Sequence, residues 1–192
     1  MNGLDRMTEI PMEDLINVLH PQQPRSESKH HVTELLNINW PMGGSMDWEA
    51  VLFGNVWEYI SSRWVSRVVG EMPSSHLYVY KPGEVEMNDV VGSVAGISKV
   101  DGVDTVLVEH KLRYSTEQTD PRENLRYYHQ VRSYCYMTGC REVWMPVLYL
   151  GCRPPDVKAV MYQFQVSDQE CAETWNMMMN LKEYLEFQQA KE

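Results

Sequence analysis

The sequence lacks a long apolar run. No stretch of its 192 residues approaches the roughly 18 to 20 uninterrupted apolar residues of a membrane-spanning helix. The first fifteen residues carry acids where a secretory signal peptide would carry an apolar segment. We therefore expect a protein with no membrane partner that stays in the cytoplasm, or in the host cytoplasm if the chain is viral.

Cysteine is scarce, and its spacing does not suit metal binding. The chain has four cysteines, which form no C-x-x-C pair and have no matching histidine spacing: Cys135, Cys140, Cys152 and Cys171. Neither a zinc site nor a disulfide framework is predicted from such a pattern. We expect reduced, mostly buried thiols.

Basic residues are also few. Lysine and arginine total 17 against 27 aspartates and glutamates, which gives a formal net charge of -10. This balance argues against a protein that coats nucleic acid through bulk charge, because that binding relies on lysine and arginine. It does not argue against an enzyme with a local basic groove, since carboxylates that hold Mg²⁺ raise the acid count by themselves.

Apolar residues are plentiful enough for a core. The chain is 43% hydrophobic and includes 6 tryptophans and 11 tyrosines, so it can form a folded globule. Its length suits one domain. We expect residues 1–29 to form an arm with a short helix at Met12–His20 and a Pro-rich polar stretch, followed by a single folded domain over residues 30–192.

The period of the apolar residues changes along that domain. An amphipathic helix is predicted for residues 45–69, and a helix that begins near Pro121 is predicted to end before Gly139. Val-, Ile- and Tyr-rich segments predict strands at 77–80, 86–98, 103–113, 142–150 and 158–165. A closing helix is predicted for 168–189. The expected class is α/β (α+β), a mixed central sheet flanked by helices in the order αβββαββα.

The most informative segment places Glu109 and Lys111 two residues apart on a predicted strand, so both side chains leave the same face. A carboxylate can hold a hard divalent cation, and an ammonium can orient an attacking water or offset charge on a phosphate. Alone, E-x-K is a weak signal, because Glu and Lys two apart are common on solvent-facing strands.

Two further patterns make the signal more specific. GNVWE (residues 54–58) lies on the first long helix and QVRSY (130–134) on the next, with EHK (109–111) between them. In this order the motifs resemble the RecB-like branch of the PD-(D/E)XK nucleases, which includes lambda-type exonucleases and CRISPR-associated RecB-like nucleases. The resemblance covers roughly residues 30–150 and implies a restriction-endonuclease-like core.

The family's remaining motif, G-x-x-D, is incomplete. The residues around GSVA (residues 92–95) match this motif, but Ala95 stands where the aspartate is expected, fourteen residues before Glu109 (109 minus 95). Two explanations stay open: a deliberately inactivated version, or a naturally degenerate nuclease. A shifted alignment that uses Asp101 or Asp104 is less favoured, because both lie in or beside the predicted Asp101-Gly102 turn.

The resemblance implies a role for each motif residue. Glu58, Glu109 and the absent carboxylate at position 95 would hold Mg²⁺ or Mn²⁺, and Lys111 would assist a metal-bound water. Gln130 would arrange Lys111 or the DNA backbone, with Tyr134 packed behind it. The ordinary alternatives are an exposed helix acid for Glu58 and plain helix contacts for the last two.

Positive charge gathers near these motifs. The candidate nucleic-acid contacts are Arg113, Arg122, Arg126 and Tyr134, with further arginines at 63, 67 and 132. Trp57, Tyr127 and Tyr128 could stack on unpaired bases or pack in the core. His30, His31 and His110 occupy no motif position and are interpreted as surface or structural residues.

An iron–sulfur cluster is not expected. Some RecB-like nucleases bind one through a cysteine upstream of the first motif and three near the C-terminus. Here no cysteine precedes Cys135. The expected cofactor is therefore Mg²⁺ or Mn²⁺ alone.

The leading hypothesis is a divalent-metal-dependent deoxyribonuclease, more an exonuclease than an endonuclease, that acts on single strands or duplex ends in DNA processing or recombination. Its small size favours an enzyme of viruses or mobile elements, and this copy would be impaired by Ala95. The rival is a nuclease-fold module that binds nucleic acid or a protein without cutting. An RNA-cutting endonuclease on the same scaffold is a third option.

Overall fold

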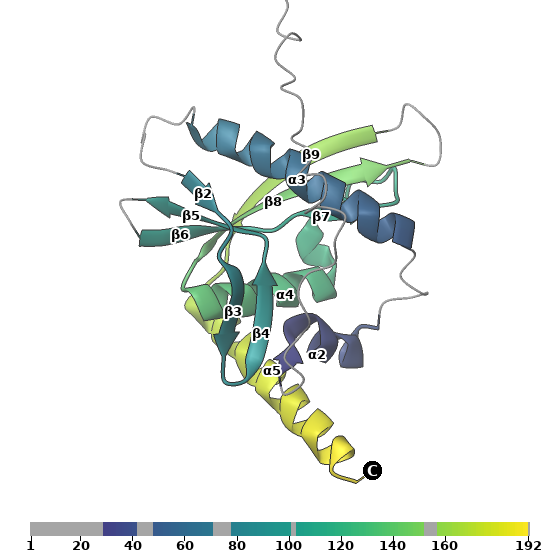
Figure 1. Cartoon of the computed structure of the whole chain (residues 1–192), viewed down its shortest axis with the longest axis vertical. Helices are drawn as coiled ribbons and strands as arrows, with labels where there is room; N and C mark the ends of the chain where they lie inside the picture. Colours follow the sequence, from purple (N-terminus) through teal and green to yellow (C-terminus); the bar gives the residue numbers. More distant parts are fainter. Residues whose placement is uncertain (1–28, 42–47, 71–77, 101–102, 152–156, 192) are drawn as a thin grey trace, which may run out of the picture.

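A computed structural model describes residues 29–41, 48–70, 78–100, 103–151 and 157–191 (Figure 1). The helix expected at Met12–His20, the turn at Asp101 and the thiol of Cys152 lie outside these residues. Within the described part of the chain, no helix has the length and apolarity needed to cross a membrane.

Helices and strands alternate along the described chain. The helices are α2 (Val32–Asn39), α3 (Trp48–Gly70), the short 3₁₀ helix η1 (Pro121–Glu123), α4 (Leu125–Thr138) and α5 (Asp168–Gln189). The strands are β1 (His30–His31), β2 (Tyr78–Tyr80), β3 (Gly83–Met87), β4 (Val90–Val94), β5 (Gly96–Val100), β6 (Val103–Val108), β7 (Lys111–Arg113), β8 (Glu142–Leu150) and β9 (Val157–Gln165).

These strands form two sheets. The smaller has the order β1-β4-β3, and the larger has the order β2-β5-β6-β8-β7, with β9 also paired to β8. The larger sheet is mixed, because β6 and β7 run parallel to β8 whereas β9 runs antiparallel to it. Helix α3 lies against β2, β7 and β8, while α4 lies against β6 and α5 (Figure 1). The expected mixed α+β class with flanking helices is confirmed.

The strand expected over residues 86–98 is wrong. The chain turns at Asn88 and Asp89, whose φ angles of 52° and 61° are left-handed, so β3 and β4 form a hairpin in the smaller sheet. Two left-handed residues match the twist of a tight hairpin, and Asn and Asp tolerate that conformation best after glycine. The turn contains no glycine, so its sequence signal is weak. A bend at Ala95 then carries the chain into β5 of the larger sheet.

Helix α2 is absent from the expected order of elements. It buries Val32, Leu35 and Leu36 completely, in the same cluster that contains residues of α4 and α5. The Glu34 carboxylate accepts a hydrogen bond from the His31 N–H at 3.3 Å, which satisfies one free amide at the helix start. Eight residues give too short a periodic pattern to separate a helix from an irregular start of the domain.

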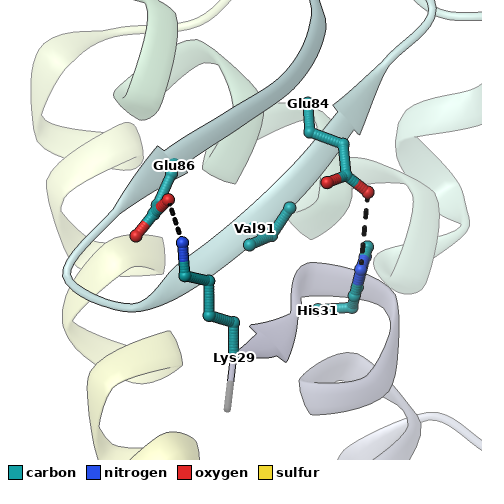
Figure 2. Close-up of a pocket in the computed structure, with 5 residues that line it drawn as sticks. All are labelled: Lys29, His31, Glu84, Glu86 and Val91. Atoms are coloured by element: carbon teal, nitrogen blue, oxygen red, sulfur yellow. Dashed lines mark hydrogen bonds and ion pairs between the residues drawn. The ribbon is translucent and has the colours of Figure 1, made fainter. Parts of the chain in front are cut away.

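Two side-chain pairs attach the start of the described chain to the smaller sheet. Lys29 Nζ lies 2.5 Å from Glu86 Oε2, and His31 Nε2 lies 3.7 Å from Glu84 Oε1. Figure 2 shows these pairs reaching across Val91, around a cavity of about 240 Å³. Each pair contributes little stability; β1 pairs directly with β4, and the two side-chain pairs reach across β4 to β3.

The strand that carries the E-x-K motif is interrupted. β6 and β7 pair with β8 in one continuous register, Val108 with Trp144 and Lys111 with Val147. The N–H of Glu109 still donates to the Trp144 carbonyl at 3.0 Å. Pro146 follows in β8 and has no N–H, so the next rung of the ladder cannot form. The break between β6 and β7 therefore falls at Glu109 and His110.

Helix α5 begins at a capping box. Glu170 accepts hydrogen bonds from the Ser167 N–H at 2.9 Å, the Tyr128 hydroxyl at 2.8 Å and the Arg132 guanidinium at 2.6 Å. These donors, the Ser167 amide first, lower the pKa of Glu170 to about 2. Since the pKa is depressed on folding, the charged form contributes stability above the ordinary carboxyl pKa, and this stability is lost as the pH falls toward 2.

Glu170→Gln is therefore expected to lower the free energy of unfolding by roughly 1 kcal/mol or less at pH 7, because the side chain is partly exposed. The difference from the parent protein should shrink between pH 4.5 and pH 2.5, where the carboxylate takes up a proton. Urea unfolding across this range measures it. Glu173→Gln is the matched control on the same helix, since Glu173 bonds to Gln169. A difference that does not change with pH would contradict the assignment.

Candidate active site

A chain of hydrogen bonds joins the E-x-K motif to helix α4. Lys111 Nζ donates to Glu109 Oε1 at 2.7 Å and to Gln130 Oε1 at 2.8 Å. The Gln130 side-chain amide donates to the Tyr134 hydroxyl at 3.1 Å. Because its nitrogen is held by Tyr134, the amide of Gln130 presents its oxygen to Lys111. The four side chains form one connected group between β6, β7 and α4.

Strand alternation decides which side chains reach that group. Val106 and Val108 pack with Val65 of α3, whereas Leu107 joins the cluster on the α4 side. Glu109 and Lys111 follow Leu107 by two and four residues, so their side chains leave the strand on the same face as Leu107. His110 points instead toward α3. The two-residue spacing therefore produces the shared face that the sequence predicted for Glu109 and Lys111.

Glu109 is a buried carboxyl group with a free oxygen. Its side chain is 7% exposed, and burial raises its pKa, while Lys111 acts in the opposite direction. Oε1 accepts from Lys111, but Oε2 is buried and has no hydrogen-bond partner within the described part of the chain. An unpaired buried carboxylate oxygen is costly. It is the atom best placed to bind a cation or a proton.

Ala95 lies beside this carboxyl group. Its backbone N–H acts to lower the pKa of Glu109, so the bend between β4 and β5 lies near the motif acid. Asp104 lies near the start of β6, five residues and roughly 16 Å of extended strand from Glu109. The alignment of Ala95 with the motif aspartate stays a prediction.

Glu58 approaches from helix α3. Its charge raises the pKa of Glu109, which places the two carboxyl groups within electrostatic reach of one another. Glu58 Oε1 also lies 2.5 Å from the ammonium of Lys81, which follows β2. Glu58, Ala95 and Lys111 thus each act on the pKa of the Glu109 carboxyl group.

These donors suit a hard divalent cation. Mg²⁺ is often held by one or two carboxylates together with water and substrate phosphate, and Mn²⁺ accepts similar oxygen ligands. Glu58 and Glu109 could supply such ligands, and Glu109 Oε2 is free of other partners. Ala95 adds no side-chain oxygen, so no group of three or more His, Cys, Asp or Glu that could hold a metal is found among the described residues.

His110 has a structural function that no motif indicated. Nδ1 lies 2.6 Å from Ser61 Oγ and Nε2 lies 3.2 Å from Ser62 Oγ, so both ring nitrogens contact helix α3. Burial, with the positive charges of Lys111 and Lys81, lowers its pKa to about 4. A neutral histidine therefore joins the middle of the E-x-K motif to the helix that carries Glu58. This agrees with its interpretation as a structural residue.

Trp57 strengthens the same junction. Its side chain is buried, and its indole N–H donates to the Pro146 carbonyl at 3.2 Å. Of the two alternatives for Trp57, base stacking and core packing, the structure supports core packing, because the residue is buried. Tyr127 is different, since its ring centroid lies 4.9 Å from Lys111 Nζ. A ring beside the motif lysine adds Tyr127 to the site.

The expected nucleic-acid contacts separate into distinct environments. Arg113, two residues beyond Lys111, donates a hydrogen bond to the Thr119 hydroxyl. Arg122 is exposed and forms a 2.6 Å ion pair with Asp120. Arg126 donates to the Thr33 carbonyl at 3.3 Å and to Asn37 Oδ1 at 2.9 Å, which fastens α4 to α2. The expected contact of Tyr134 with nucleic acid is wrong, because its side chain is 1% exposed and lies behind Gln130.

Gly92 makes room for Tyr134. A Cβ atom at position 92 would lie 2.7 Å from Tyr134 Cε1 and 3.0 Å from Cδ1. Because the ring is fully packed, it cannot move away without disturbing its neighbours. The glycine of the incomplete motif and the tyrosine of the helical motif are therefore in direct contact, which explains why position 92 has no side chain.

Gly92→Ala is expected to lower the free energy of unfolding by about 1–3 kcal/mol, the usual cost of overpacking a filled core. The control is Gly54→Ala in α3, where an added Cβ meets nothing within 4 Å. That change should be neutral or stabilising, because alanine favours a helix by up to about 1 kcal/mol. Urea unfolding of both variants measures the contrast, and equal effects would refute the proposed contact.

The fold resembles those of two solved exonucleases. LHK-Exo, an alkaline exonuclease from Laribacter hongkongensis solved in complex with dAMP, superposes with a TM-score of 0.52 at 15% identity, over 85% of this chain and 94% of that one. A phage-related exonuclease from Haemophilus somnus gives a TM-score of 0.54 at 10% identity, over 92% of this chain and 99% of that one. Comparisons with models of protein families and with curated proteins find no match. At these identities the likeness establishes the fold, which is the one expected from the motifs.

Proposed function

We propose that this chain is a divalent-metal-dependent deoxyribonuclease of the RecB-like PD-(D/E)XK type, an exonuclease whose cleavage is impaired by Ala95. The observation that carries the proposal is the buried hydrogen-bonded group of Glu109, Lys111 and Gln130, with Ala95 and Glu58 at its side. A solvent-facing Glu-Lys pair would not be buried or bonded to a helix behind it.

Each side chain has a role in this proposal. Glu58 and the free Oε2 of Glu109 would hold Mg²⁺ or Mn²⁺, which when bound supplies a more acidic water and offsets charge on the phosphate. Lys111 has three N–H donors, of which Glu109 and Gln130 engage two. The third can donate to a phosphate oxygen or orient the attacking water. Gln130, held by Tyr134, positions Lys111 without contacting the substrate.

DNA is the proposed partner. Arg113 lies on the same strand as Lys111, and Arg122 is exposed, so both can contact phosphates. Arg126 instead forms a hydrogen bond with Asn37 of α2. The two exonucleases with this fold, one of them solved with dAMP, support a deoxyribonucleotide polymer as substrate. The proposed role is DNA processing or recombination for a virus or mobile element, in the cytoplasm.

A second candidate is a binding module of the same fold that holds DNA without cutting it. One observation favours it: each carboxylate of the site already has a lysine partner, Glu58 with Lys81 and Glu109 with Lys111. The pocket is then electrically balanced without a metal ion, and its two ammonium groups could contact phosphates directly.

A cleavage assay with the Ala95→Asp variant tests the proposal. End-labelled single-stranded and duplex DNA are incubated with Mg²⁺ or Mn²⁺, and cleavage that EDTA abolishes is expected. Ala95→Asp combined with Glu109→Gln should show none, because it lacks a ligand while preserving shape. Intact DNA of both kinds with both metals, despite measurable DNA binding, would refute the nuclease proposal and favour the binding module.

A further inference from the structure

Helix α3 carries an exposed apolar stripe that faces away from the site. Phe53, Val56 and Ile60 are between 39% and 51% exposed and are spaced by three and four residues, so they share one helix face. Trp57 and Ser61, on the other face, are buried. Large exposed side chains that line up in this way usually mark an interaction surface.

Two arginines continue the same face toward the end of α3. Arg63 follows Ile60 by three residues, and Arg67 follows Arg63 by four. Both are exposed, and neither forms an ion pair with a carboxylate in the part of the chain that the structure describes. We call the five residues the α3 stripe: Phe53, Val56, Ile60, Arg63 and Arg67. Aromatic side chains and arginine are enriched in protein interfaces.

Helix α5 carries a complementary surface. Tyr184 and Phe187 are 53% and 59% exposed, and Glu173 and Glu183 are exposed on the same side. We call these four residues the α5 stripe. Figure 1 shows the C-terminal half of α5 projecting from the body of the molecule. The apolar pair lies at the projecting end, and the acids lie nearer the body.

We propose that the α3 stripe of one copy binds the α5 stripe of a second copy, with the two helices antiparallel. Both surfaces are apolar at one end and charged at the other, and their charges are opposite. In Figure 1 the end of α5 and helix α3 lie at opposite ends of the molecule, so the stripes cannot meet within one copy. The proposal is independent of the proposed nuclease function.

The spacing of the groups selects the antiparallel arrangement. On α3 the arginines lie on average 8.5 residues, or about 13 Å, beyond the centre of the apolar residues. With Phe187 and Tyr184 opposite Val56 and Ile60, an antiparallel helix places Arg63 and Arg67 opposite positions near 180 and 176, between Glu183 and Glu173. A parallel helix would place both arginines beyond Gln189, where α5 has already ended.

Because the two stripes are different surfaces, each copy has one of each and can bind two others. Association should therefore depend on concentration and weaken with salt, since part of the contact is between exposed opposite charges. Sedimentation velocity of the full chain across protein concentration is expected to show species heavier than the 22.4 kDa of one copy.

Charge reversal on either stripe tests which surfaces meet. Arg63→Glu with Arg67→Glu should weaken self-association by about tenfold or more, and so should Glu173→Lys with Glu183→Lys. Each double variant alone places like charges opposite each other. A mixture of the two should associate again, because each reversed stripe then meets its complement. A structural defect in either variant would not be repaired by mixing.

The control variants make the same change in net charge as the two test variants, but at exposed positions outside both stripes. Arg122→Glu with Lys158→Glu matches the first variant, and Glu117→Lys with Glu123→Lys matches the second; both should associate like the parent chain. A parent chain that stays monomeric at all concentrations would overturn the proposal. Failure of the mixture to associate would do so too. Loss of DNA binding in Arg63→Glu with Arg67→Glu, with self-association unchanged, would assign the α3 stripe to nucleic acid and overturn it as well.

Discussion

Ala95→Asp is expected to raise the affinity of the site for Mn²⁺ by at least about 100-fold. Loss of a residue that merely supports a metal ligand commonly costs 10- to 100-fold in affinity, so a regained ligand should change it by no less. The N–H of Ala95 acts on the Glu109 carboxyl group, so position 95 lies near this carboxylate, whose Oε2 has no hydrogen-bond partner among the described residues. A third carboxylate would also give the pocket more acids than its two lysines can balance.

Isothermal titration with Mn²⁺ measures this change. Ala95→Asn is the matched control, because it has the size of aspartate but only a neutral oxygen, and its affinity should rise far less. Ala159→Asp adds the same charge at an exposed position of β9 and controls for net charge. Equal affinity in Ala95→Asp and Ala95→Asn would mean that position 95 does not contribute a charged ligand.

Lys111→Met should cost about 3–5 kcal/mol of unfolding free energy at neutral and higher pH. Removal of one partner from a buried ion pair leaves the other charge uncompensated, and the side chains of Lys111 and Glu109 are only 12% and 7% exposed. Glu109 would then have no cation to oppose the effect of burial, and its pKa would rise further above its ordinary value. Adding Glu109→Gln to Lys111→Met should recover part of the loss, because the buried charge is gone.

The pH dependence of Lys111→Met has a definite sign. A carboxyl group whose pKa is raised on folding favours the folded state at low pH, and that contribution is lost as the pH rises through the folded pKa. The deficit of Lys111→Met should therefore be small near pH 5 and grow toward pH 8 in urea unfolding. Lys182→Met is the control, since Lys182 pairs with exposed Asp89 and should cost under about 1 kcal/mol. A deficit that is constant with pH would refute the assignment.

Local sequence signals predicted several elements accurately. The closing helix was expected at 168–189 and lies at Asp168–Gln189, and the strand expected at 142–150 is β8. The end predicted at Gly139 is confirmed, because this residue caps α4 with a φ of +80°. These elements are long, and strong end signals bound them. Where the sequence signal is short, the prediction was wrong: α2 was not predicted, and the Asn88-Asp89 turn was predicted as part of a strand.

By itself the sequence determined which side chains could do chemistry and that Glu109 and Lys111 share a face, because a strand repeats every two residues. Only the tertiary structure decided that Glu58 from α3 and the backbone at Ala95 act on the Glu109 carboxyl group, and that Gly92 and Tyr134 touch. It also decided that Tyr134 is core and that Arg126 fastens α2. Such contacts join residues tens of positions apart, and periodicity carries information only about neighbours along one element.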